Sequence, residues 1–396
     1  MKRTKYALVR GGVALAASVV AVIGCLGGVS PASAAPAFSE STIASGLDIP
    51  WDLEVAPDGV ILTGERRGRF VAIFPRGGTR EVRADLSSVF VNNETGLMGL
   101  ALDPRFAQTR RVYSCQSEKV NGGNGSSVPG VIGSIPLPWP SAGLAITVRS
   151  WRVSPDWSSM TREGILRADI PVNAGGRHAG CGLTSAPDGT LWVGTGDNAI
   201  ATNAQSWNSL GGKVLHINAN GTPARGNPNP SSPIFSLGHR NVQDIDFGPR
   251  GVYAIEQGTN VDDELNLLVR GGNYGYKPDR TPGIYDETVP MTDPSRVPGA
   301  IGAVWRSGNG TIATPALKFL PAQWGPLAGS VVISALKGKH LEFVTLTGDG
   351  RGVVRTSQAL VNKYGRLRAL AIDRDGSLLV STSNGGNADK VIRLRP

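Results

Sequence analysis

Short runs of alternating hydrophobic and polar residues recur along the chain, and most of them end at a turn rich in Pro, Asp and Gly. In the first copy, residues 51–55 read WDLEV, the turn is APDG at 56–59, and a second apolar run follows at 60–62. Alternation turns one face of a strand toward a core, and Asp-Gly supplies the positive φ of a tight hairpin turn. The pattern therefore predicts repeated β-hairpins. Further copies span 100–113, 183–193, 245–255 and 370–380, and 329–346 adds a strand pair without the Asp-Gly turn.

Six such units predict an all-β fold, a six-bladed β-propeller, whose blades close radially and protect their edge strands. No amphipathic helical pattern of about 10–15 residues alternates with the hairpins, which argues against a parallel α/β sheet. We expect residues 35–396 to form this single propeller domain. Two segments interrupt the rhythm: 119–145, which is rich in Gly, Ser and Pro, and 277–315, a long polar stretch. Long insertions of this kind are usually functional, and in a propeller they would cover one end of the central channel.

Residues 1–34 have the pattern of a secretory signal peptide. A basic stretch that ends at Arg10 precedes an apolar run over 11–28 and the small residues ASA at 32–34. Cleavage after Ala34 would release the protein outside the cytoplasm as a secreted or extracytoplasmic domain. A second interpretation stays open, because VIGC at 22–25 resembles a lipoprotein box that would leave Cys25 as a lipid-anchored N-terminus. No later stretch reaches the roughly 18 continuous apolar residues of a membrane span.

Composition narrows the function classes. Hydrophobic residues make up 40% of the 396 residues, which excludes wholesale disorder, and the 53 glycines and 27 prolines lack the Gly-X-Y period of collagen. The formal charge is +9, but four of the basic residues lie before residue 11, which leaves +5 for the remainder. This charge, without clustered Lys/Arg runs, argues against nucleic-acid binding.

Besides Cys25, the chain contains two cysteines, Cys115 and Cys181. An even pair in an exported protein predicts a disulfide. On the chain-entropy model such a bond would stabilise the fold by about 4 kcal/mol. Two buried free thiols are the alternative.

Signatures of several common enzyme classes are missing: G-x-S-x-G, H-E-x-x-H, C-x-x-C and the Walker loop. Among the four histidines, His178 is the best catalytic candidate, because its segment GGRHAGCG (175–182) lets backbone and ligand approach closely just before a predicted strand. A second cluster combines LGHRN (237–241) with the acid-rich EQGTNVDDE (256–264). Acids beside amide and glycine carbonyls suit a hard cation such as Ca²⁺. A solvated acidic turn is the alternative.

Together these segments resemble the soluble quinoprotein glucose/sorbosone dehydrogenase family. The resemblance runs in order over nearly all of the chain after residue 34, and its central block is long and specific. It is carried by ETGLMGL (94–100), the His178 segment, GGKVL (211–215), FSLGHRN (235–241), EQG (256–258), DELNL (263–267) and GGNYG (271–275).

The resemblance implies a propeller that binds pyrroloquinoline quinone (PQQ) and Ca²⁺ at one end of its channel. The implied reaction is oxidation of the anomeric carbon of an aldose by hydride transfer to PQQ, with an electron acceptor that the sequence does not identify. By family pattern His178 is the general base, and Arg240 stabilises charge on the reacting quinone oxygen. The resemblance also implies that the cofactor is contacted by Arg240, Glu94 and Asn241, and that its carboxylates are bound by Lys337, Arg366 and Arg368. It implies that the catalytic calcium is ligated by the backbone carbonyls of Gly258 and Thr259. A further calcium site is implied at Glu264 and Tyr274.

Two departures from the family pattern matter. Arg177 stands where some members have an acid before the catalytic histidine, so we expect weaker orientation of the base by a carboxylate. The stretch SGNG at 307–310 lacks the aromatic residues that often line the sugar pocket. These departures keep open a non-catalytic propeller that binds a protein or glycan, because fold does not settle function. A calcium-dependent lactonase is a third interpretation, but it needs carboxylates converging on an axial metal.

Overall fold

The computed structural model describes residues 37–120, 128–132, 135–141 and 143–396, without the side chains of 128–141. These residues belong to one compact unit. The predicted signal peptide, the alternative lipoprotein box and Cys25 lie outside the described residues.

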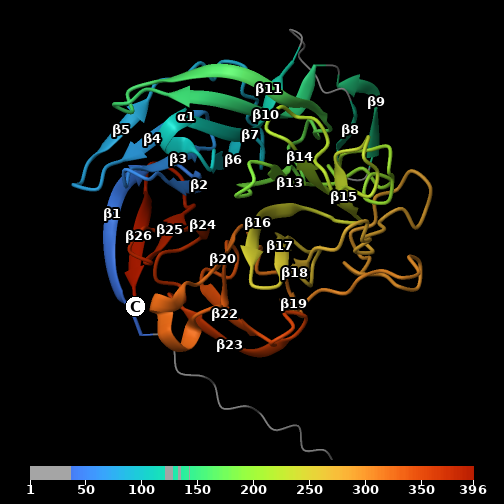
Figure 1. The fold of residues 1–396 in the computed structure, drawn as a ribbon. Coiled ribbons are helices and arrows are strands. Elements are labelled where there is room, and N and C mark those ends of the chain that lie inside the picture. The colour runs from blue at the N-terminus through green and yellow to red at the C-terminus, as the bar shows by residue number, and fades with distance from the viewer. Residues whose placement is uncertain (1–36, 121–127, 133–134, 142) are drawn as a thin grey trace, which may run out of the picture. The chain divides into compact units, whose positions relative to one another are not determined.

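Within the described residues, six four-stranded antiparallel sheets follow one another around a common centre, which confirms the predicted six-bladed β-propeller (Figure 1). Blade 1 contains β2 (Pro50–Val55), β3 (Ile61–Glu65), β4 (Arg69–Ile73) and β5 (Thr79–Val82); blade 2 contains β6 (Leu97–Leu102), β7 (Arg111–Lys119), β10 (Leu144–Val153) and β11 (Met160–Ile170); blade 3 contains β12 (Gly180–Ser185), β13 (Leu191–Thr195), β14 (Lys213–Ile217) and β15 (Ile234–Leu237). Blade 4 contains β16 (Val242–Gly248), β17 (Gly251–Glu256), β18 (Glu264–Leu267) and β19 (Trp305–Arg306); blade 5 contains β20 (Leu317–Phe319), β21 (Val331–Ser334), β22 (Leu341–Leu346) and β23 (Val353–Ala359).

Blade 6 joins the two ends of the described chain. It contains β24 (Leu367–Ile372), β25 (Leu378–Thr382) and β26 (Asp389–Arg395), and its outer strand is β1 (Ser39–Leu47). Strands β1 and β26 pair antiparallel, with Ser39 opposite Arg395. The first strand of every blade contacts the first strand of the next, and β24 contacts β2. The ring is therefore closed, as its propeller class requires.

Each hairpin predicted from the Asp-Gly pattern is confirmed. In blade 1, Val55 pairs with Ile61 across the predicted turn, and Gly59 adopts a φ of 84° there. The strand pair expected in 329–346 is β21 with β22. Helix is confined to a single α-helical turn, α1 (Phe106–Thr109), and a 3₁₀ segment, η1 (Ala322–Leu327), in the described chain. No helix there has the length and apolarity to cross a bilayer.

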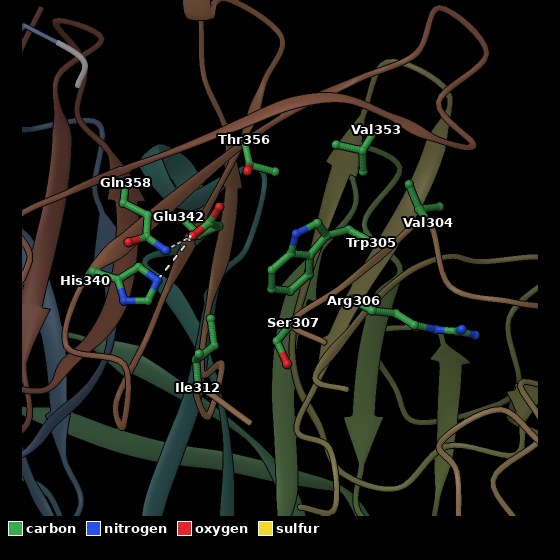
Figure 2. Close-up of a pocket in the computed structure, with 10 residues that line it drawn as sticks. All are labelled: Val304, Trp305, Arg306, Ser307, Ile312, His340, Glu342, Val353, Thr356 and Gln358. Atoms are coloured by element: carbon green, nitrogen blue, oxygen red, sulfur yellow. Dashed lines mark hydrogen bonds and ion pairs between the residues drawn. The ribbon is translucent and has the colours of Figure 1, made fainter. Parts of the chain in front are cut away.

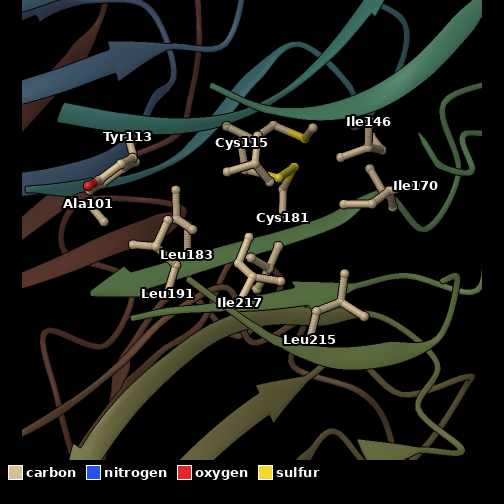
Figure 3. Packing of buried hydrophobic residues seen from close by; sticks show 14 of the residues in the cluster. Ala101, Tyr113, Cys115, Ile146, Ile170, Cys181, Leu183, Leu191, Leu215 and Ile217 are labelled. Atoms are coloured by element: carbon tan, nitrogen blue, oxygen red, sulfur yellow. A yellow bond between two sulfur atoms is a disulfide. The ribbon is translucent and has the colours of Figure 1, made fainter. Parts of the chain in front are cut away.

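The hydrophobic core lies between neighbouring blades, because the alternating positions of each strand turn their apolar side chains toward the next sheet. Figure 3 shows the cluster between blades 2 and 3, in which Ile146 and Tyr113 face Leu183 and Leu215. The Cys115–Cys181 disulfide crosses this interface, with a Cα–Cα distance of 5.5 Å. It confirms the predicted pairing, and the free-thiol alternative is wrong.

The two polar segments leave the blade pattern as expected. The 119–145 segment contains a separate two-stranded sheet, β8 (Val128–Ile132) with β9 (Ile135–Ser141). The 277–315 segment is almost wholly without regular structure apart from β19.

Candidate active site

Strand direction gathers the candidate residues at one end of the propeller. In a four-stranded antiparallel blade, the segment entering the first strand and the connection between the second and third strands lie at the same end. His178 precedes β12 and Arg240 precedes β16, while the 258–263 loop follows β17. Loops held by a rigid scaffold commonly carry function, so this end is the candidate site.

His178 is fixed in orientation by a carboxylate. Its Nδ1 atom lies 2.8 Å from Oδ1 of Asp197, and both side chains are almost fully buried. Asp197 is on the loop after β13, and in this loop Gly196 lets the His178 backbone come close, since a Cβ on Gly196 would lie 1.8 Å from the His178 carbonyl oxygen. With Nδ1 donating to Asp197, Nε2 is left as the acceptor atom. The expectation of weak carboxylate orientation is therefore wrong, because Asp197 supplies from another loop the acid missing at position 177.

The 277–315 segment reaches the base, as its predicted covering role requires. The Tyr285 hydroxyl donates to Oδ2 of Asp197 at 2.7 Å and lies 3.3 Å from Nδ1 of His178. It also lies 2.9 Å from the Tyr276 hydroxyl. Through Tyr285 this segment thus contacts the Nδ1 side of the imidazole.

Glu287, from the same segment, bridges two arginines next to the base. Its carboxylate accepts a hydrogen bond from Arg240 Nη2 at 3.1 Å and pairs with Arg177. One of its oxygens is 3.8 Å from His178 Nε2. The charge of Arg177, which the sequence leaves unbalanced, is therefore neutralised by Glu287.

Arg240 is held on both sides but keeps one free donor. Its Nη1 donates to the Gln257 carbonyl at 3.0 Å, and its backbone N–H donates to Glu256 at 2.7 Å. Its Nε is buried and finds no partner within the described residues. An unsatisfied buried donor is costly, so a ligand acceptor beside this atom would be favoured.

Glu94 and Asn241 meet, as the resemblance implies for two cofactor contacts. Asn241 Nδ2 donates to Glu94 at 3.2 Å, and Asn241 Oδ1 accepts the Gly180 N–H at 2.9 Å. These bonds connect the loop before β6 with the loops before β12 and β16. They hold a carboxylate and an amide together at this end of the propeller.

Three arginines form a cationic cluster, which we define as Arg66, Arg366 and Arg368. Burial, Arg366 and Arg66 together lower the pKa of Arg368 to about 9. None of the three has an ion pair in the described part of the chain. Arg368 stacks on Trp51 at 3.6 Å, and the buried Nε of Arg66 has no hydrogen-bond partner among the residues that the structure describes. Like charges held together without a direct ion pair among the described residues fit an anionic ligand that carries several carboxylates.

Lys337 lies in the connection between β21 and β22, at the same end of the propeller. Its side chain is exposed, and among the described residues it forms no ion pair. The structure therefore leaves this cation available but records no contact between it and the cationic cluster.

The acid-rich loop after β17 is not a solvated turn, so that alternative is wrong. Glu256, Asp263 and Glu264 are each at most 1% exposed. Asp263 accepts hydrogen bonds from the backbone of Gly258 and Ala313, both at 3.0 Å, and from the Thr311 hydroxyl. These carboxylates organise the loop, and the described residues contain no cluster of three His, Cys, Asp or Glu side chains suited to a metal. The carbonyls of buried Gly258 and Thr259 accept no hydrogen bond from described residues, so a hard cation fits the backbone here better than the acids.

Glu264 and Tyr274 are engaged by other groups. Burial and the neighbouring Glu256 carboxylate raise the pKa of Glu264 to about 8, although Arg306 lies 3.2 Å from it. The Tyr274 hydroxyl donates to the Leu267 carbonyl at 2.6 Å, and its ring stacks on His239. Within the described residues, the side chains of Glu264 and Tyr274 do not contact each other.

Four residues of the site were missed by reasoning from sequence: Asp197, Arg66, Tyr285 and Glu287. Asp197 carried a usable signal, since GTGDN at 194–198 places an acid between glycine and asparagine at the end of a strand. Arg66 lies in an ordinary hairpin turn, and Tyr285 and Glu287 lie in a segment without periodicity. Nothing local distinguishes these three.

The chain is similar to known proteins over most of its length. Residues 47–393 match the family model described as Glucose / Sorbosone dehydrogenase. The chain is 27% identical to aldose sugar dehydrogenase YliI of Escherichia coli over 88% of this chain and 91% of that protein. It is also 27% identical to quinoprotein glucose dehydrogenase B of Acinetobacter calcoaceticus over 60% of this chain and 52% of that protein. The chain thus spans about half of the Acinetobacter protein, and it spans 59% of a Synechocystis protein to which it is 31% identical.

A solved structure extends the similarity to three dimensions. The PQQ-bound form of aldose sugar dehydrogenase from Streptomyces coelicolor superimposes with a TM-score of 0.72 at 26% identity, covering 91% of this chain and 99% of that one. The similarity thus includes every blade rather than one shared motif.

Proposed function

This chain belongs to the glucose/sorbosone dehydrogenase family, and from that premise we propose that it is a PQQ-dependent dehydrogenase that oxidises aldoses at the anomeric carbon. One observation carries the proposal. The acceptor nitrogen of His178, the guanidinium of Arg240 and the unpaired cationic cluster gather at the same end of one propeller. A base beside a site built for a polyanion is what this reaction needs.

His178 is the proposed general base. Asp197 holds Nδ1 as the proton donor, so Nε2 can accept the proton of the anomeric hydroxyl. The resulting imidazolium is stabilised by the same carboxylate. Burial of the pair keeps water from competing for this hydrogen bond.

Arg240 is the proposed electrostatic partner of the reaction. Its backbone and side chain are fixed by Glu256 and Gln257, so its charge needs little reorganisation as negative charge develops on a neighbouring oxygen. Glu94 and Asn241 are proposed to contact the same ligand from the opposite loops.

The residues present fit PQQ, a tricarboxylate. Arg366 and Arg368, with Lys337, are the proposed carboxylate-binding residues, and Arg66 joins them because its buried Nε lacks a partner within the described residues. PQQ, when bound, supplies the quinone that takes the hydride from the sugar. The protein supplies position and charge around it.

Ca²⁺ is proposed to bind beside this cofactor, at the carbonyls of Gly258 and Thr259. When bound it supplies a fixed positive charge next to the cofactor. A further calcium site is proposed at Glu264 and Tyr274 from the family resemblance, and a cation there would offset the burial of the Glu264 carboxylate.

We place this activity outside the cytoplasm, with residues 1–34 as the export signal and 35–396 as the catalytic domain. The Cys115–Cys181 disulfide supports the location, because such bonds persist in oxidising compartments. The alternative is that the same domain is held outside the cytoplasm by a lipid anchor at Cys25.

The test is dye reduction by the purified protein with a panel of aldoses, with PQQ and Ca²⁺ added together, singly or not at all. We expect activity only with both, and its loss when EDTA withholds calcium. A parallel absorbance titration with PQQ separates the outcomes. Tight PQQ binding without turnover on any aldose would reject the substrate class, and absence of PQQ binding would favour a non-catalytic propeller.

A further inference from the structure

A cavity of about 470 Å³ lies between blades 4 and 5, outside the site described above. Figure 2 shows Trp305 of β19 on one side of it, and His340, Glu342 and Gln358 of blade 5 on the other. Its volume is in the range of small-molecule sites. No residue proposed to bind PQQ or to act on the sugar lines it.

The blade 5 wall is a preassembled hydrogen-bonding surface. Glu342 Oε2 accepts a hydrogen bond from Gln358 at 2.9 Å and lies 3.3 Å from His340 Nε2. His340 Nδ1 in turn donates to the Gly338 carbonyl at 2.9 Å. Glu342 Oε1 and Gln358 Oε1 accept no hydrogen bond within the described chain. The free oxygens of this neighbouring carboxylate and amide can each accept a hydrogen bond from a hydroxyl group.

The blade 4 wall is aromatic. Trp305 is mostly buried, and its Nε1 donates to no group among the described residues. An indole with an apolar face and an unused N–H suits a ligand that has both C–H and O–H groups. Val304 and Ile312 extend the apolar part of this lining.

The charges around the cavity are already paired. Burial lowers the pKa of His340, but the Glu342 carboxylate, 3.3 Å from Nε2, and the Gly338 carbonyl together raise that pKa above its ordinary value. Arg306 at the rim pairs with Glu264 at 3.2 Å. The cavity therefore offers neither an unpaired cation for an anionic ligand nor an unpaired anion for a cationic one.

We propose that this cavity is an accessory binding site for a neutral sugar ring, distinct from the site of oxidation. The C–H face of a pyranose would pack on Trp305, and adjacent hydroxyls would bond to Glu342 and Gln358. In the same lining, Arg306 pairs with Glu264 at the start of β18, and Ser307 accepts a hydrogen bond from the backbone of Asp263 in the loop after β17. An occupied accessory site would thus lie directly behind the proposed calcium loop.

The test measures binding of methyl β-D-glucoside and methyl β-D-galactoside to the purified protein, by saturation-transfer NMR and calorimetry. These glycosides have no free anomeric hydroxyl, so binding is read without PQQ and without turnover, and the result does not depend on the proposed oxidation. We compare wild type with Gln358→Ala, an exposed position, and with Glu342→Gln. Gln108→Ala, which removes the same side chain from an exposed position in α1, is the control.

We expect binding of at least one glycoside by wild type and Gln108→Ala, and affinity at least tenfold weaker in both cavity variants. The kcat for aldose oxidation should be the same in all four proteins. Failure of both glycosides to bind wild type, or equal affinity in wild type and both cavity variants, would overturn the accessory site. Thermal unfolding of each variant shows whether a loss of glycoside affinity comes from misfolding. If Glu342→Gln is misfolded, the affinity of Gln358→Ala decides the result.

Discussion

The Nδ1 atom of His178 lies 2.8 Å from Oδ1 of Asp197, a residue 19 positions later in the chain and on a different loop. This contact decides which imidazole nitrogen can act as a base. It also explains how the protein can carry Arg177 next to that base. The acid that orients His178 comes from Asp197, and Arg177 is neutralised by Glu287.

Replacing Asp197 by Asn should reverse the imidazole tautomer. The amide would donate to Nδ1, so Nε2 would carry the proton and could not accept one from the sugar. We expect kcat to fall on the order of 10²–10⁴-fold, with PQQ affinity unchanged. Dye-linked kinetics and a PQQ titration check both. Asp188→Asn, in an exposed turn of the same blade, is the control, and equal kcat in the two variants would refute the role of Asp197.

The cationic cluster should matter for the cofactor more than for the fold. Arg66→Gln and Arg366→Gln each remove a proposed charge-assisted hydrogen bond, worth about 1.5–3 kcal/mol, so PQQ affinity should fall about 10–100-fold. Because the three arginines repel one another, the melting temperature without PQQ should stay the same or rise. Arg76→Gln, at an exposed turn of blade 1, serves as the control. A lower melting temperature with unchanged PQQ affinity would mean that the cluster is structural.

Glu287 is expected to oppose the cofactor. Its carboxylate pairs with the guanidinium groups of Arg240 and Arg177, and its negative charge would repel an anionic ligand that approaches these arginines. In Glu287→Gln we therefore expect PQQ to bind more tightly, by about tenfold, in a titration without sugar. Glu81→Gln, an exposed acid on β5, is the comparison. Unchanged or weaker binding in Glu287→Gln would show that Glu287 does not compete with the cofactor.

Glu54 should make stability depend on pH. Burial and the neighbouring Asp52 carboxylate raise the pKa of Glu54 to about 8. The folded protein then holds this proton more tightly than the unfolded chain, so the free energy of unfolding falls as pH rises from about 4.5 toward 8. Urea unfolding at pH 5 and pH 8 should show a smaller fall for Glu54→Gln than for wild type. An identical fall in both proteins would contradict the assignment.

The hairpins could be predicted from the sequence because their information is local. Alternation and the Asp-Gly turn lie within about ten residues, as in 51–62. The pairing of β1 with β26 could not be predicted this way, since Ser39 and Arg395 are brought together only when the ring closes.

In the site too, residues in recognisable local patterns could be predicted, and partners from distant loops could not. His178 and Arg240 stand in glycine-rich segments that could be recognised, and Cys115 and Cys181 could be paired by elimination. The partners of these residues come from other loops: Asp197 orients the base, and Glu287 reaches it from a segment without periodicity. The acids of 256–264 were recognised as a group, but their burial and their internal hydrogen bonds depend on 311–313, which no local pattern indicates.

The most direct test of the account is one comparison of wild type and His178→Ala, each supplied with PQQ and Ca²⁺, in which dye reduction with aldoses and PQQ affinity are measured on the same samples. The account predicts turnover by wild type, no detectable turnover by His178→Ala, and the same PQQ affinity for both. Undiminished turnover in the variant would contradict the assignment of His178 as the base.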